Sequence, residues 1–121
     1  MKIFILLNAI IEILAGLVMF LFPNKLPSPE GITPRAGTLA SMYGAAALAI
    51  GFFALQVWRT YPNADLAYTL LLTLVIFHAG VMTAAYRGVR SGIKDMMPVA
   101  ILHGVLAVSY THLTLPTTPY V

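Results

Sequence analysis

The sequence predicts an all-α integral membrane protein, a four-helix bundle whose fourth helix is truncated. Hydrophobic residues make up 60% of the chain and charged residues only 9%, with a mean hydropathy of +0.87. These values are typical of integral membrane proteins rather than soluble domains. Residues 3–22 are almost wholly apolar, and twenty residues at 1.5 Å rise span a hydrocarbon core of roughly 30 Å. Three more apolar segments follow within 121 residues, a length that suits one domain.

The first predicted span, residues 3–22, carries an acid, Glu12, near its middle. A carboxylate at the bilayer centre costs at least ~2.5–3.5 kcal/mol, so we expect Glu12 to face protein, be paired or be protonated. Asn8 lies one turn before it, and the small residues Ala15 and Gly16 lie one turn after it. The apolar run is too long for a signal peptide, so we interpret it as a retained span.

The second predicted span covers residues 38–58, after a proline-rich loop at 23–36 that cannot be helical throughout. Small residues recur along it at helical spacing and predict a helix-packing face. This small-residue stripe consists of Ala40, Gly44, Ala47 and Gly51. Trp58 closes the span, where amphipathic aromatic side chains settle at a membrane interface.

The third and fourth predicted spans each carry one histidine. The third covers residues 66–86 and holds His78 slightly past its midpoint, but His78 and Gly80 point in nearly opposite directions, so the pattern leaves the inward face open. The fourth covers residues 97–110 and holds His103. About a dozen apolar residues follow Pro98, a length that we expect to be too short to span.

The end of the chain resembles something other than protein-coding sequence. Residues 108–118, VSYTHLTLPTT, resemble the in-frame translation of a widely used transposase sequencing adapter. We therefore expect residues 1–107 to form the four-helix transmembrane domain and residues 108–121 to be a non-native tail without functional meaning.

The distribution of basic residues predicts the orientation in the membrane. Loops 23–37 and 87–97 would share one side, and they hold five basic residues against two, Lys2 and Arg59, on the other. The positive-inside rule makes these loops cytoplasmic in a multi-pass protein of the cell inner membrane. The five basic residues are Lys25, Arg35, Arg87, Arg90 and Lys94. This charge belongs to the connecting segments, so no nucleic-acid partner is expected.

Polar residues inside the spans are the candidate ligand-binding or proton-handling groups. Glu12 and His78 lie near the midplane, where an imidazole and a carboxylate can pair, whereas Tyr43 and His103 lie about a third of the way in from the basic-loop side. The structural alternative is that these groups only hold helices together by hydrogen bonds. The candidates are Asn8, Glu12, Tyr43, His78 and His103.

No catalytic site is predicted, because the chain has no cysteine and no Ser-His-Asp set, phosphate loop or dinucleotide fingerprint. No metal site is predicted either, since Glu12, His78 and His103 come from three helices without a close-spaced pair. Bis-histidine haem ligation needs both histidines at one depth, and their positions differ by about a turn. The six methionines are scattered and predicted to be lipid-facing or core filler.

Four apolar segments carry a resemblance to known proteins: IIEILAGLVMFLFP in the first span, YGAAALAIG in the second, and the FHAGV and LHGV histidine segments. They resemble the DoxX-like group of small bacterial membrane proteins and related four-helix families. The resemblance covers residues 1–107 and implies four short spans. DoxX itself is associated with quinone-linked oxidoreductases as a membrane subunit, but no quinone-contacting residue is transferred to a position here.

These observations favour a non-enzymatic subunit or accessory of a larger membrane assembly. The expected partners are the lipid bilayer and either further copies of this chain or other membrane subunits. One alternative is binding of a lipid-soluble ligand such as a quinone, with proton exchange at Glu12, His78 and His103. Another is transport of a small solute by an oligomer.

Overall fold

The computed structural model describes residues 1–26 and 31–114. Within these ranges the chain forms four α-helices and two short 3-10 helices, η1 (Pro23–Lys25) and η2 (Lys94–Met96), with no strand. The α-helices are α1 (Lys2–Leu21), α2 (Pro34–Thr60), α3 (Ala64–Arg90) and α4 (Met97–Thr114). Each of these four helices, α4 counted together with η2, is long and apolar enough to cross a membrane. The predicted all-α, multi-pass membrane fold is confirmed.

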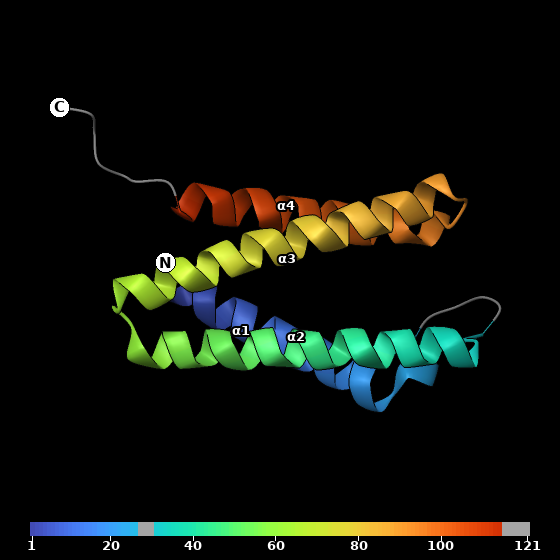
Figure 1. Ribbon diagram of the computed structural model, residues 1–121, viewed down its shortest axis with the longest axis horizontal. Helices are drawn as coiled ribbons and strands as arrows, with labels where there is room; N and C mark the ends of the chain where they lie inside the picture. The colour runs from blue at the N-terminus through green and yellow to red at the C-terminus, as the bar shows by residue number, and fades with distance from the viewer. Residues whose placement is uncertain (27–30, 115–121) are drawn as a thin grey trace. The chain divides into compact units, whose positions relative to one another are not determined.

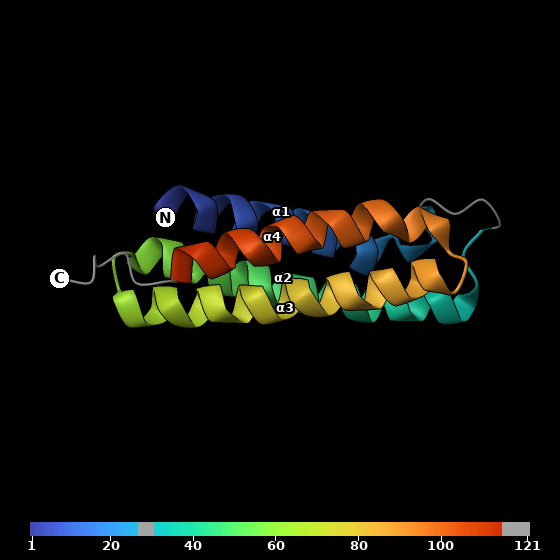
Figure 2. The ribbon, with the colours of Figure 1, turned by 90° about the horizontal axis from the view of Figure 1, so that it is seen from above.

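The chain divides into two compact units, Met1–Asn63 and Ala64–Val121. Each unit is built on an antiparallel helical hairpin, α1 with α2 in the first and α3 with α4 in the second (Figure 1). Figure 2 shows the second hairpin from another side, with the short turn that joins α3 to α4. Two helices that follow each other in the chain commonly pack side by side as an antiparallel hairpin of this kind.

Glycines hold the first hairpin together by letting the backbones of α1 and α2 approach closely. A Cβ atom at Gly44 would lie 2.6 Å from the backbone nitrogen of Phe20 and 2.8 Å from the carbonyl oxygen of Gly16. A Cβ atom at Gly51 would lie 2.9 Å from the backbone nitrogen of Ile13. Gly44, Ala47 and Gly51 are buried, so the small-residue stripe lies against α1 as small residues do between membrane helices.

The observed α2 is longer at both ends than residues 38–58. It begins at Pro34, because Pro suits the first helical position and the Thr33 hydroxyl accepts a hydrogen bond from the Ala36 N–H at 3.2 Å. At its end the Thr60 hydroxyl donates to the Gln56 carbonyl at 3.0 Å. Lys2 lies 5.5 Å from the Trp58 ring centroid, a cation–π contact that joins the start of α1 to the end of α2.

The second hairpin resolves which face of α3 is inward. Leu71, Leu74 and His78 are buried, whereas Gly80 is exposed and a Cβ atom there would meet no atom within 4 Å. His78 therefore lies in the interior and Gly80 on the outside. The helix also extends four residues beyond residue 86, to Arg90.

The expectation that the fourth helix is too short to span is wrong. α4 runs to Thr114, and the 20-residue segment Lys94–Leu113 is long and apolar enough to cross a membrane. Two polar residues do not end the helix because their hydroxyls bond to carbonyls four residues earlier: Ser109 to Val105 at 2.8 Å and Thr111 to Ala107 at 2.9 Å. Part of the adapter-like segment is thus helical, and its residues 115–118 lie outside the described ranges.

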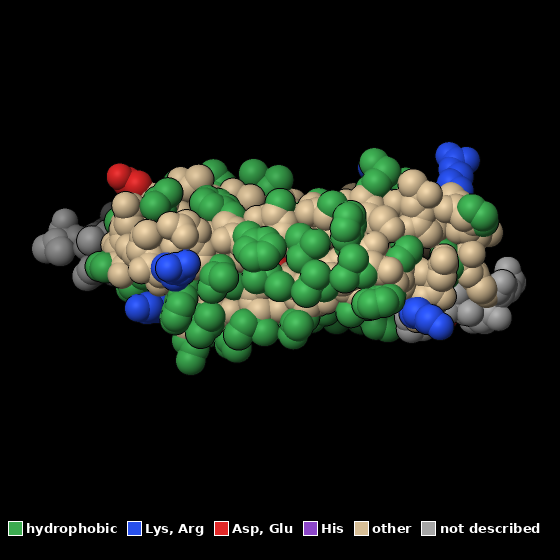
Figure 3. Space-filling model, turned by 90° about the horizontal axis from the view of Figure 1, so that it is seen from below, with side chains coloured by type: hydrophobic (Ala, Val, Ile, Leu, Met, Phe, Trp, Pro, Cys, Tyr) green, Lys and Arg blue, Asp and Glu red, His purple; other side chains and the backbone are tan. Residues whose placement is uncertain are grey.

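The surface matches that of a membrane-embedded protein. On the face shown in Figure 3, hydrophobic side chains cover the middle, and Lys and Arg side chains lie toward the ends. Large apolar residues of α1 such as Ile3, Ile11 and Leu14 are more than half exposed. In a bilayer these side chains contact lipid instead of water, which removes the cost of exposing them.

Candidate ligand-binding site

The two histidines of the second hairpin meet between α3 and α4. The Nδ1 atoms of His78 and His103 are 2.7 Å apart, and their ring centroids are 4.9 Å apart. His78 is fully buried and His103 is half-buried. One Nδ1 must carry a proton and donate it to the other, so two neutral rings would be different tautomers. One Nε2 atom would then be a donor and the other an acceptor.

The predicted difference in depth between these histidines is wrong. The turn folds back early, since the Ile93 N–H donates to the Gly88 carbonyl at 3.0 Å and η2 begins at the next residue. His78 lies ten residues before Gly88, and His103 lies nine residues after Lys94. The two side chains therefore come level. Rings hydrogen-bonded at this distance leave no space for a porphyrin between them.

Aromatic rings surround the histidine pair. Phe77 contacts both imidazoles edge-on, with its centroid 5.2 Å from that of His78 and 6.4 Å from that of His103. Tyr110 of α4 is buried and stacks on His78 at 5.4 Å and 19°. Tyr110 lies within residues 108–118, the segment that we expect to be non-native. The result is a polar pair in largely apolar surroundings.

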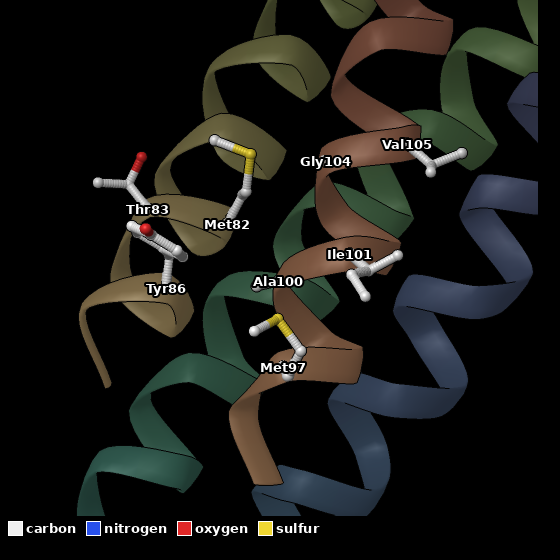
Figure 4. Close-up of a pocket in the computed structure, with 8 residues that line it drawn as sticks. All are labelled: Met82, Thr83, Tyr86, Met97, Ala100, Ile101, Gly104 and Val105. Carbon is white, nitrogen blue, oxygen red and sulfur yellow. The ribbon is translucent and has the colours of Figure 1, made fainter. Parts of the chain in front are cut away.

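An open groove of about 540 Å³ lies between α3 and α4, and its lining begins one helical turn after His78 along α3. Figure 4 shows its lining, in which the thioethers of Met82 and Met97 lie between the two helices. Met82 is one helical turn after His78, and Gly104 follows His103 directly. The remaining lining residues are Thr83, Tyr86, Ala100, Ile101 and Val105. The lining is almost entirely apolar.

The other candidate residues belong to the first hairpin. Glu12 and Asn8 are buried in α1, and Tyr43 of α2 is half-buried. Glu12 interacts electrostatically with Tyr43 across the hairpin. Gly16 is buried against α2 while Ala15 is exposed, so only one of the two small residues beside the acid lies at this contact. The predicted pairing of Glu12 with His78 joins residues of different hairpins and stays a prediction.

Sequence reasoning missed Met82, Met97 and Gly104 as components of a site. The sequence could have indicated Met82, because it follows His78 by four residues and therefore shares its helix face. Among the described residues, no group of three or more His, Asp or Glu side chains is placed to hold a metal ion. The candidate site therefore consists of the histidine pair and the adjoining groove.

Comparisons of the chain with protein-family models, with curated proteins and with solved structures find no match.

Proposed function

We propose that this protein is a small, non-enzymatic multi-pass membrane protein that binds a lipid-soluble ligand between α3 and α4. The observation that carries the proposal is that one hairpin holds both a groove of about 540 Å³ and the His78–His103 pair. Ligand sites are typically apolar pockets of about 300–1,000 Å³ with a few convergent polar groups. The groove and the two imidazoles supply these two components on one hairpin.

The chemistry of the pair suits a ligand with an apolar body and a head that carries oxygen atoms. An Nε2–H can donate to a carbonyl, and an unprotonated Nε2 can accept from a hydroxyl. A quinone fits because its oxidised form offers carbonyls and its reduced form offers hydroxyls. A proton taken up at one Nε2 can be balanced by release from the other, with the shared proton crossing the 2.7 Å gap.

The experiment is an NMR titration of protein with ¹³C-labelled methionine methyl groups, using a short-chain quinone in lipid nanodiscs. We expect the signals of Met82 and Met97 to shift, because both side chains line the groove. Met19 and Met42 lie in the first hairpin and serve as internal controls whose signals stay in place. A titration that leaves Met82 and Met97 unchanged contradicts the proposal.

Matched variants separate loss of binding from loss of fold. Gly104→Leu should block the groove, because a Cβ atom at Gly104 already lies 3.2 Å from the Met82 sulfur. Gly80→Leu is the control, since its Cβ atom meets nothing within 4 Å. His103→Phe removes one polar partner, and loss of a hydrogen bond worth about 1 kcal/mol weakens binding by roughly fivefold. Circular dichroism should show the same helix content in all three variants.

A second candidate is a role as a subunit or accessory of a larger membrane assembly. It is favoured by the row of exposed apolar side chains on α1, which a partner helix can cover as well as lipid can. Native mass spectrometry from nanodiscs tests it, with a homo-oligomer or a retained partner as the expected result. A monomer that shows the quinone-dependent methionine shifts would leave ligand binding as the function.

The orientation proposed for this function places the protein in a bacterial inner membrane with both basic loops in the cytoplasm. Support comes from five basic residues in the segments 23–37 and 87–97, against two elsewhere. The turn between α3 and α4, near which the groove lies, would then face the cytoplasmic side. Glu12, in the first hairpin, is a second group that would exchange protons within the membrane.

A further inference from the structure

The second hairpin also brings together nitrogen and sulfur atoms of the kind that bind a soft metal ion. The two Nδ1 atoms of His78 and His103 converge at 2.7 Å from facing helices. Met82 is the nearest thioether along the chain, four residues after His78 on the same helix face. Long side chains on a helix point back toward its N-terminus, so the Met82 side chain reaches back over the turn that carries His78.

The position of the Met82 sulfur relative to α4 supports this convergence. Its Sδ atom lies 3.2 Å from the place that a Cβ atom of Gly104 would occupy, and Gly104 is the residue directly after His103. Met82 therefore packs over the α4 turn that presents the second imidazole. It can do so because Gly104 has no side chain to fill that space. The two imidazoles and the Met82 thioether thus come from neighbouring turns of α3 and α4.

We propose that His78, His103 and Met82 form a binding site for a monovalent copper ion, Cu(I). Thioether sulfur selects Cu(I) over harder metals, and imidazole is also a good copper ligand. A tetrahedral Zn(II) site would need four ligands, and the described residues place no third His, Asp or Glu beside this pair. A low coordination number with neutral, soft ligands leaves Cu(I) as the ion that fits.

The change in geometry that binding requires is small. Metal–nitrogen bonds are about 2.0 Å long. For a nitrogen–metal–nitrogen angle between tetrahedral and trigonal, the two nitrogen atoms then lie roughly 3.3–3.5 Å apart. The Nδ1 atoms must therefore separate by less than about 1 Å from their 2.7 Å hydrogen bond. The Nδ1 proton that the two rings share must move to Nε2 of its own ring as the metal enters, because a ligating nitrogen is unprotonated and each imidazole then stays neutral. The groove that Met82 and Met97 line is open on the outside of the hairpin.

The test uses tag-free, full-length protein in nanodiscs, titrated anaerobically with Cu(I) in competition with a chromogenic Cu(I) chelator. We expect one high-affinity copper per chain, lost in His78→Phe. Met82→Leu nearly conserves volume, so it should fold and bind more weakly, by at least the roughly tenfold that loss of an outer-shell partner costs. Met19→Leu, in the first hairpin, is the matched control and should bind as the unmodified chain does.

X-ray absorption on the copper-loaded protein gives a second readout, the identity of the ligand atoms. The expected first shell contains two nitrogen atoms and one sulfur atom, and the sulfur contribution should disappear in Met82→Leu. Copper that binds equally well to His78→Phe, or a first shell without sulfur, would overturn the proposal and indicate adventitious binding elsewhere. The quinone titration is done without metal, so the failure of one proposal leaves the other standing.

Discussion

At the scale of single residues, Glu12 is the group whose placement the membrane most constrains. It is buried in α1 and interacts with Tyr43 of α2 within one hairpin. A polar contact between membrane helices stabilises the folded state by about 0.6 kcal/mol on average, because the unfolded chain in the membrane also finds partners. A structural role for Glu12, in which it helps to hold α1 and α2 together, therefore suffices to explain a buried acid at this position.

A double-mutant cycle with Glu12→Gln and Tyr43→Phe measures the energetic coupling between these two residues. We expect a favourable coupling of about 0.6 kcal/mol in the free energy of unfolding, since a phenol beside a carboxyl can donate a hydrogen bond to it. The measurement is denaturant-induced unfolding in mixed micelles, followed by circular dichroism. Strictly additive single effects would show that the two side chains do not stabilise each other.

At the scale of the helix, close backbone packing distinguishes α1 and α2. The Gly44→Ala substitution would place a Cβ atom 2.6 Å from the backbone nitrogen of Phe20, where no flexible side chain can move aside. We expect it to lower the free energy of unfolding by about 1–3 kcal/mol through overpacking. The same micelle unfolding measurement checks this value.

Gly80→Ala is the matched control for that substitution. Its new methyl group meets no atom within 4 Å, and Ala is favoured over Gly inside a helix by about 1 kcal/mol. It should therefore leave the protein unchanged or slightly more stable. If Gly44→Ala were as well tolerated as Gly80→Ala, the close approach of α1 to α2 would be refuted.

At the scale of the whole molecule, the orientation in the membrane is testable because the chain contains no cysteine. Single cysteines at Ser91 and Asn63 flank α3, which is long enough to span. In intact cells, a membrane-impermeant maleimide should label Asn63→Cys and spare Ser91→Cys, which becomes reactive only after lysis. The reverse pattern would invert the proposed orientation, and labelling of both would show that α3 does not span.

Much of the fold could be predicted because apolar length sets which segments span a bilayer. Residues 3–22 correspond to α1 within a residue, and the small-residue stripe predicted a packing face that lies against α1. The predicted positions of the helix ends were less accurate. Thr33 and Pro34 start α2 early, and hydroxyl-to-carbonyl hydrogen bonds carry α4 through Ser109 and Thr111.

The sequence by itself determined that this is a helical membrane protein with polar groups at Asn8, Glu12, Tyr43, His78 and His103 inside its spans. Only the tertiary structure decided that His78 and His103 meet at 2.7 Å and that Met82 of α3 packs against Gly104 of α4. The physical reason is that lipid is as apolar as the protein interior, so hydrophobic periodicity does not mark the inward face of a membrane helix. The inward face of α3 is set instead by the register in which α3 packs against α4. That register depends on where the turn after Gly88 folds back.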